Sequence, residues 1–126
     1  MSAPIDLMAP RVLGRTGRQV GRLGLGCSFG VSRESCLRAF DHGVNYFFWG
    51  SVRTEGMAQA IRELAPGHRN ELTVVVQCYV RFPSLVRKSV ERGLKILGIE
   101  TADVLLLGWA RGSFDTWHFR RITGPS

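Results

Sequence analysis

Cysteine is scarce in this chain of 126 residues, which holds three of them, Cys27, Cys36 and Cys78. The count is odd, no C-x-x-C pair occurs, and no paired His-x-His ligands lie nearby. These absences argue against a disulfide framework and against a zinc site. We therefore predict that the three cysteines are small buried apolar side chains and that the protein holds no metal.

Long hydrophobic runs are also missing. The longest, near Leu72–Val76 and Val104–Leu107, fall far short of the roughly 20 apolar residues that a membrane span requires. The first ten residues carry no basic start followed by an apolar stretch, so no signal peptide is predicted. We expect a soluble cytoplasmic protein that has no membrane partner.

Acidic residues are few, with 10 Asp and Glu against 17 Lys and Arg, which gives a formal net charge of +7. Only Lys88 and Lys95 are lysines; the other basic residues are arginines. Positive charge favours nucleic acid through neutralisation of phosphates. The arginines are nevertheless scattered, and zinc spacing, an aromatic RNA signature and a basic helix before heptads are all absent. We do not expect nucleic acid to be a partner.

The composition is that of a folded domain, with 44% hydrophobic and 21% charged residues. Short apolar ends around a Gly-x-x-Gly turn predict a hairpin over residues 11–20. The glycine-rich residues 21–26 follow as a short strand with close backbone neighbours. Helices and strands then alternate, with helices predicted over 32–42, 54–64 and 83–97 and strands over 44–48, 72–78 and 103–107.

Local signals support this alternation. The apolar residues of helix 54–64 share one face, and Ala65-Pro66-Gly67 is predicted to end that helix. Ser32 is the predicted N-cap of the first helix, and Gly98 is predicted to close the third. Strand 72–78 is continuously apolar, as is typical of a parallel strand covered on both faces. The sequence therefore predicts an α/β domain with a parallel sheet and helical cover. The face of helix 54–64 consists of Met57, Ala60, Ile61 and Leu64.

Five strings of residues occur in the order and spacing of one known family. They are Leu13–Gly17, Arg22–Gly26, Ala39–Phe47, Ser89–Gly98 and Ala102–Leu107. Together they resemble the N-terminal half of an aldo-keto reductase over about residues 11–109. The resemblance implies a partial (β/α)8 TIM-type barrel, with a hairpin that plugs the bottom and about four parallel βα units. We expect residues 1–10 to form a loose leader and residues 110–126 an atypical tail.

The resemblance also implies a chemistry and shows where this chain departs from it. The family transfers a hydride from NADPH or NADH to a carbonyl, using a Tyr, a Lys, an Asp and a His at the strand ends. In this chain the matching positions are occupied by Phe48 (for Asp), Arg53 (for Tyr), Gln77 (for Lys) and Gly108 (for His). Phe48 carries no charge, and Arg53 is a poor proton donor. We therefore expect no intact catalytic set and an impaired oxidoreductase.

Other residues near these positions are candidates for a pocket. They are Cys27, Ser28, Trp49, Tyr79 and Trp109. Tyr79 is the one phenol near Gln77, so it is open both as a relocated acid and as a packing residue.

The resemblance implies an NADP(H) cofactor, but the family holds its phosphates mostly with loops of the C-terminal half. We therefore predict weak or absent binding of NADP(H) by this chain. The stretch Gly24–Gly30 superficially resembles a dinucleotide fingerprint. Its spacing is one residue too long, and Phe47-Phe48 stands where the acidic ribose partner belongs.

Two functions remain open at this point. The chain is either a truncated, inactive aldo-keto reductase (a pseudoenzyme that would take a small carbonyl substrate if active) or a non-catalytic half-barrel. The loss of the family pattern after Trp109 favours the first. Open sheet edges favour the second, with a homodimer or another partner covering them.

Overall fold

The structure is a computed structural model that describes residues 4, 6, 9–50, 52–80 and 82–108. Most of the predicted leader, the tail 110–126 and Trp109 lie outside these residues. Within them a hairpin precedes a four-stranded parallel sheet whose strands follow one another in chain order. Helices connect the strands, so the predicted α/β fold of a hairpin and parallel βα units is confirmed as a partial barrel. The described residues form no closed barrel.

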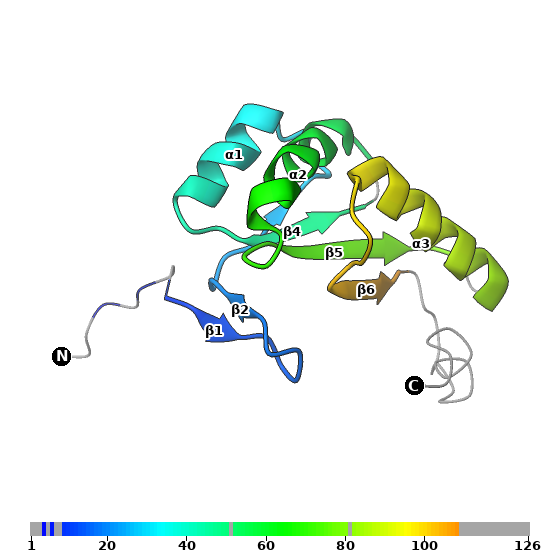
Figure 1. The fold of residues 1–126 in the computed structure, drawn as a ribbon, viewed down its shortest axis with the longest axis horizontal. Coiled ribbons are helices and arrows are strands. Elements are labelled where there is room, and N and C mark those ends of the chain that lie inside the picture. Colours follow the sequence, from blue (N-terminus) through cyan, green and yellow to red (C-terminus); the bar gives the residue numbers. More distant parts are fainter. Residues whose placement is uncertain (1–3, 5, 7–8, 51, 81, 109–126) are drawn as a thin grey trace.

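The strands and helices alternate after the hairpin (Figure 1). The hairpin strands are β1 (Arg11–Val12) and β2 (Gln19–Val20). The sheet strands are β3 (Leu25–Gly26), β4 (Tyr46–Trp49), β5 (Thr73–Cys78) and β6 (Val104–Leu107). The helices are α1 (Arg33–Asp41), α2 (Glu55–His68) and α3 (Pro83–Leu97). In Figure 1 α1 and α2 lie above the sheet, α3 runs beside it at the right, and the hairpin lies below it.

Helix termini follow the predicted capping signals with one exception. The Ser32 hydroxyl accepts a hydrogen bond from the backbone N–H of Ser35 at 3.1 Å. Gly98 ends α3 in the left-handed region, at φ 66°. The prediction that Ala65-Pro66-Gly67 ends α2 is wrong, because the helix continues to His68. Proline in a last turn forfeits only one backbone hydrogen bond, and the His68 carbonyl then accepts from the N–H groups of Glu71 and Leu72.

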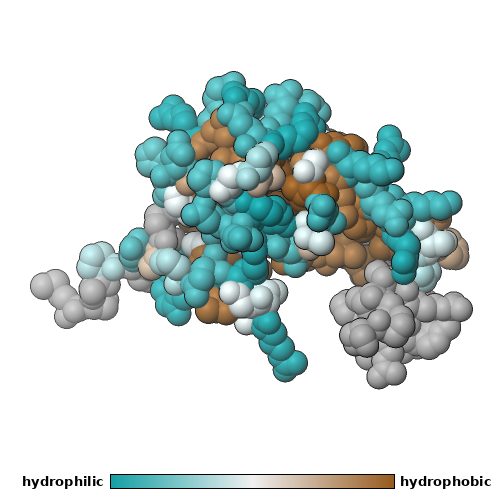
Figure 2. Space-filling view, viewed as in Figure 1, coloured by the Kyte–Doolittle hydropathy of each residue, from teal (hydrophilic) through white to brown (hydrophobic). Residues whose placement is uncertain are grey.

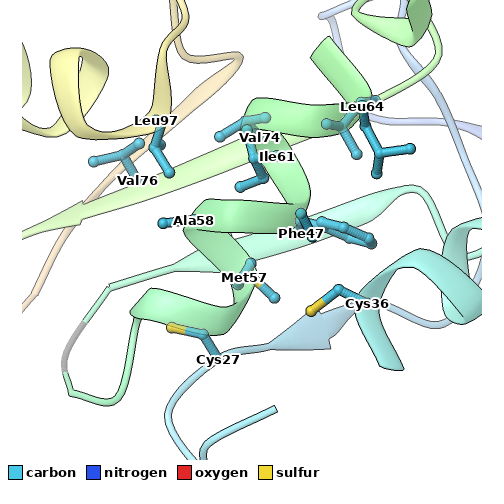
Figure 3. Packing of buried hydrophobic residues seen from close by; sticks show 12 residues of the cluster. Cys27, Cys36, Phe47, Met57, Ala58, Ile61, Leu64, Val74, Val76 and Leu97 are labelled. Atoms are coloured by element: carbon cyan, nitrogen blue, oxygen red, sulfur yellow. The ribbon is translucent and has the colours of Figure 1, made fainter. Parts of the chain in front are cut away.

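The hydrophobic core lies between the sheet and its helices (Figure 3). Phe47 and Val74 enter it from the sheet, and the predicted face of α2 is buried against them. All three cysteines are buried free thiols, as predicted. Figure 2 shows hydrophilic side chains over much of the helical layer, which is the expected outer surface of such a sandwich. None of the described helices has both the length and the apolar character needed to cross a membrane.

No helix of the described residues covers the opposite face of the sheet. Strand register pairs Phe48 with Val75 and Val75 with Val104, so these side chains share one face. Gln77 and Leu106 follow two residues later on the same face, at its carboxyl end. In a complete barrel this face would line the interior, and here it positions Gln77 beside the strand ends.

The hairpin is fastened at the amino end of the sheet. Arg18 donates to the Leu72 carbonyl and forms an ion pair with Asp103 at 3.2 Å. The Asn45 amide donates to the carbonyls of Gln19 and Glu71 at 2.7 and 2.9 Å. This placement is the one that the resemblance implied for a hairpin closing the bottom of a barrel.

Candidate functional site at the carboxyl edge of the sheet

The carboxyl ends of the four parallel strands point to one edge of the sheet. Enzymes built on (β/α)8 barrels place their reacting groups at this edge. Phe48 and Gln77 lie next to the ends of β4 and β5, and Gly108 follows β6 directly. Arg53 lies in the loop after β4. The structure thus brings three of the four predicted catalytic positions to adjacent strand ends.

Gln77 is the centre of this arrangement. Its side chain is half-buried, and the Tyr79 hydroxyl donates a hydrogen bond to its Oε1 atom at 2.7 Å. A glycine directly follows each of the neighbouring strands, β4 and β6. A Cβ atom added at Gly50 would lie 2.9 Å from the Gln77 Cβ, and one added at Gly108 would collide with the Gln77 Nε2. The Gln77 side chain therefore occupies a slot that the two glycines leave open.

Phe48 packs beside this slot without any polar role. Its ring lies 3.7 Å from the Cβ position of Gly26 and 3.6 Å from that of Gly50. Gly108 continues the β5–β6 ladder, since its N–H donates to the Cys78 carbonyl at 2.8 Å. The site thus holds aromatic and glycine surface at the positions where the resemblance implies a carboxylate and an imidazole.

Arg53 makes its contact with the loop after β3, away from the slot around Gln77. It is exposed and is the one non-glycine residue with positive φ, 54°, among the described residues. Its Cδ lies 3.5 Å from the Cβ position of Gly30, in the loop after β3. The aliphatic part of Arg53 therefore lies between the loops after β3 and β4.

The predicted pocket residues separate into two groups. Tyr79, 40% exposed, joins Gln77 at the strand ends, and Ser28 is half-buried in the loop after β3. Cys27 is fully buried, and its thiol donates to the Gly50 carbonyl at 3.1 Å (Figure 3). The Trp49 indole donates to the Thr54 carbonyl at 3.1 Å and lies 3.2 Å from the Cβ position of Gly93 in α3. Both of the latter side chains point to the helical layer, away from Gln77.

Gly50 was not recognised as a neighbour of Gln77 by sequence reasoning. The exposed Phe29 and Phe82, in the loops after β3 and β5, were also not singled out. An aromatic residue in a loop that follows a strand end, where a barrel presents its binding loops, is the signal that would have found these two.

The described cavities lie at the other end of the sheet. One of about 290 Å³ is lined by Arg69 and residues 98–101, among others, and one of about 400 Å³ by residues that include Phe40 and His68. Within the described ranges no cluster of three or more His, Cys, Asp or Glu side chains fits a metal ion. Neither cavity therefore contributes to the carboxyl edge.

Comparison with known proteins supports the fold. No protein-family model and no curated protein matches the sequence. In structure the chain is similar to the holo form of the aldo-keto reductase AKR11C1 from Bacillus halodurans, with a TM-score of 0.63 and 21% identity. The match covers 79% of this chain and 40% of that one, so the chain spans less than half of that reductase. The described residues thus adopt the fold of a partial aldo-keto-reductase-type (β/α)8 barrel.

Proposed function

We propose that these 126 residues form a non-catalytic half-barrel, which does not by itself reduce carbonyls in the manner of an aldo-keto reductase. One observation carries this proposal. The described strand ends and the loops that follow them contain no Asp, Glu, Lys or His, and Arg53 is their one charged side chain. A reductase needs charged and acidic groups at this edge to stabilise and protonate the developing alkoxide.

The Gln77–Tyr79 pair does not replace those groups. When a hydride reaches a carbonyl carbon, negative charge grows on the oxygen and a proton must follow. The Gln77 amide donates hydrogen bonds but does not release a proton. The Tyr79 hydroxyl donates its hydrogen bond to Gln77 Oε1. The Gln77 amide is neutral, so it does not favour a phenolate as a cation would. The pair therefore binds an acceptor better than it transfers a proton.

The residues present also do not fit the NADP(H) cofactor that the fold implies. A Cβ added at Gly24 would lie 2.6 Å from the Tyr46 ring, and Gly26 lies against Phe48. These glycines therefore serve close packing between β3 and β4, and they do not form a cradle for a pyrophosphate. We accordingly propose weak or absent binding of NADP(H).

Titration of NADPH into the folded protein tests both the absence of carbonyl reduction and the weak binding of NADP(H). Tryptophan fluorescence reports binding, circular dichroism checks folding, and NADPH absorbance in the presence of small aldehydes reports turnover. The B. halodurans reductase under the same conditions is the positive control. We expect no saturation below about millimolar NADPH and no aldehyde-dependent oxidation. Saturable micromolar binding overturns the cofactor proposal, and oxidation that Tyr79→Phe abolishes overturns the non-catalytic one.

A second candidate function is self-association, which the open edges of the sheet favour. Among the described residues β3 and β6 each pair with one strand only, and Leu106 on β6 is 39% exposed. A two-fold axis along the strands would bring β6 of one copy beside β3 of the other in parallel. Sedimentation velocity tests this. We expect a dimer that Leu106→Lys weakens, whereas a monomer at about 100 μM rejects the proposal, given that stable dimers have dissociation constants in the micromolar range or below.

A further inference from the structure

Helix α3 has an inner side that packs on the sheet and an outer side that faces away from it. Val86, Gly93 and Leu97 are the buried residues of the inner side. A Cβ added at Gly93 would lie 3.2 Å from the Trp49 ring, so the glycine lets the helix approach the sheet closely. This contact fixes which side of α3 points outward. Hydrophilic and hydrophobic residues segregate more sharply on α3 than on α1 or α2.

The outer side of α3 is rich in basic residues. Arg87, Lys88, Arg92 and Lys95 are all exposed, and Glu91 is the one acidic residue of the helix. Within the described part of the chain, these four cations form no ion pair and no side-chain hydrogen bond. Figure 2 shows hydrophilic side chains projecting from the part of the molecule where Figure 1 places α3, with hydrophobic surface beside them.

Positive charge is concentrated in this segment. Residues 81–100 hold five basic and two acidic residues, counting Arg81 before the helix and Glu100 after it. Less than a sixth of the chain thus carries almost half of the formal net charge of +7. By contrast, Arg62 of the adjacent helix α2 pairs with Glu55 at 3.0 Å. The segment around α3 therefore has an excess of cations that the fold does not neutralise.

Both lysines of the chain lie on α3. Lys88 and Lys95 are seven residues apart, which is about two helical turns, so they lie on one line along the helix. Arg92 lies between them, four residues after Lys88. We call these three residues the cationic ridge. A lysine ammonium is a compact charge on a flexible stem, so such a ridge suits a surface that presents many anions in no fixed orientation.

Exposed hydrophobic side chains border the cationic ridge. Leu85 and Ile96 are 45% and 38% exposed, and Phe82, directly before the helix, is 69% exposed. We call these three residues the apolar flank. Arg92 lies seven residues after Leu85 and four before Ile96, so the ridge and the flank adjoin along the helix.

The apolar flank favours one anionic partner over others. Cations alone complement any polyanion, including the phosphates of a nucleic acid. A bilayer that contains anionic lipids offers negative headgroups together with hydrocarbon directly beneath them. Basic residues beside exposed apolar ones on a helix match that combination.

From this combination we propose that the outer side of α3 docks on an anionic lipid bilayer, with the cationic ridge on the headgroups and the apolar flank inserted between them. A peripheral contact needs neither a spanning helix nor a signal peptide, and the absence of those two features was the reason to expect no membrane partner. The strand ends take no part in this contact. A failure of the proposal therefore leaves the non-catalytic half-barrel standing, and the reverse also holds.

Flotation with vesicles of two compositions tests the docking. One contains phosphatidylcholine alone, and the other contains about one third phosphatidylserine, which gives the surface a negative potential. We expect the protein to float with the anionic vesicles alone and to be released by about 1 M salt, which shortens the Debye length to about 3 Å. No binding to the anionic vesicles, or equal binding to both kinds, overturns the proposal.

Two double variants with equal loss of charge test the cationic ridge. Lys88→Gln with Lys95→Gln removes its lysines, and Arg11→Gln with Arg15→Gln removes two exposed cations of the hairpin segment. Each basic residue near an anionic surface strengthens binding about fivefold, so we expect the first variant to bind about 20-fold more weakly and the second to be nearly unchanged. Circular dichroism verifies the fold of each. Equal losses would mean that the vesicles attract the net charge of the whole chain, which rejects α3 as the docking surface.

The apolar flank is tested in the same way. Leu85→Gln with Ile96→Gln removes two of its side chains, whereas Val12→Gln with Leu23→Gln removes two that are 55% and 47% exposed and lie before the first helix. We expect about tenfold weaker binding to anionic vesicles for the first variant and no change for the second, because only the flank inserts into the bilayer. Equal affinities of the flank variant and the parent protein contradict the insertion.

A DNA duplex provides the competing polyanion. We expect it to bind more weakly than the anionic vesicles at the same salt concentration, because it offers no hydrocarbon to the apolar flank. A duplex that binds more tightly than the vesicles, and that depends on Lys88 and Lys95 but not on Leu85 and Ile96, assigns the ridge to nucleic acid and rejects the lipid surface.

Discussion

The two ends of the parallel sheet are held by different interactions. At the amino end, Asp103 accepts from Arg69 at 2.9 Å and from the Val74 N–H at 2.7 Å, and it pairs with Arg18 at 3.2 Å. At the carboxyl end, one hydrogen bond joins Tyr79 to Gln77 between two glycines. Polar side chains thus fasten the amino end, whereas the carboxyl end is packed closely around one side-chain hydrogen bond. In barrels the amino end is where stability is concentrated and the carboxyl end is where ligands bind.

The amino end needs this fastening because the hairpin does not hold itself. Its strands have two residues each, and Val20 is the one buried residue of the four. An isolated two-stranded hairpin is marginally stable at best in water. Tertiary hydrogen bonds of Arg18 and Asn45 therefore stabilise the hairpin, which buries little apolar surface of its own.

Removal of the Asp103 carboxylate is the strongest test of this difference. Its side chain is 12% exposed and pairs with two arginines of 23% and 24% exposure. Asp103→Ala leaves two largely buried cations without their partner, and we expect a loss of about 3 kcal/mol in the free energy of unfolding. Urea denaturation followed by circular dichroism measures it.

Glu34→Gln serves as the control for Asp103→Ala. Glu34 pairs with Arg33 at 3.3 Å, but its side chain is 72% exposed. Exposed pairs contribute little, so its effect is expected to be a small fraction of the first. Comparable losses in the two variants would mean that the amino end gains nothing special from its partly buried network.

A pair of glycines in α2 provides a sharper probe of the carboxyl end. A Cβ added at Gly56 would collide with the Val31 carbonyl, a backbone atom that does not move aside cheaply. We expect Gly56→Ala to destabilise the protein by about 2 kcal/mol through overpacking. Gly67→Ala meets no atom within 4 Å and gains helix propensity, so it is expected to stabilise by about 0.5 kcal/mol. Thermal unfolding compares them, and a shift of the same sign in both variants would contradict the close backbone contact between α2 and the loop before α1.

Much of this architecture could be predicted from sequence because its signals are local. Continuous apolar runs marked β5 and β6, and Ser32 and Gly98 marked helix ends that the structure confirms. The slot around Gln77 could not be predicted in the same way. It depends on strand register, which places Gly50 and Gly108 beside a residue that lies 27 or more positions away in the chain. Register is set by tertiary packing, and a single sequence does not display it.

For the end of α2, local signals gave a wrong prediction. Pro66 and Gly67 are strong local breakers, yet the helix passes both. The turn after His68 is fixed by backbone hydrogen bonds and by Arg69, which donates to the Leu72 carbonyl at 2.8 Å and to the Thr101 carbonyl at 2.6 Å. These tertiary contacts outweigh the local preference, so the amino-end network also decides where a helix stops.

The helical layer between the two ends gives an expected effect that depends on pH. Burial raises the pKa of the Cys36 thiol from 9.0 to about 11, and the nearby Cys27 adds to the rise. Between these values the unfolded chain releases the thiol proton while the folded protein keeps it, so stability falls as the pH rises. The fall amounts to at most about 1.4 kcal/mol for each pH unit. Urea midpoints from pH 8 to 10.5 measure it, and Cys36→Ala is the control, because its other titrating groups are unchanged. If both proteins lose stability equally over this range, the alkaline sensitivity arises from groups outside the helical layer and Cys36 is not its source.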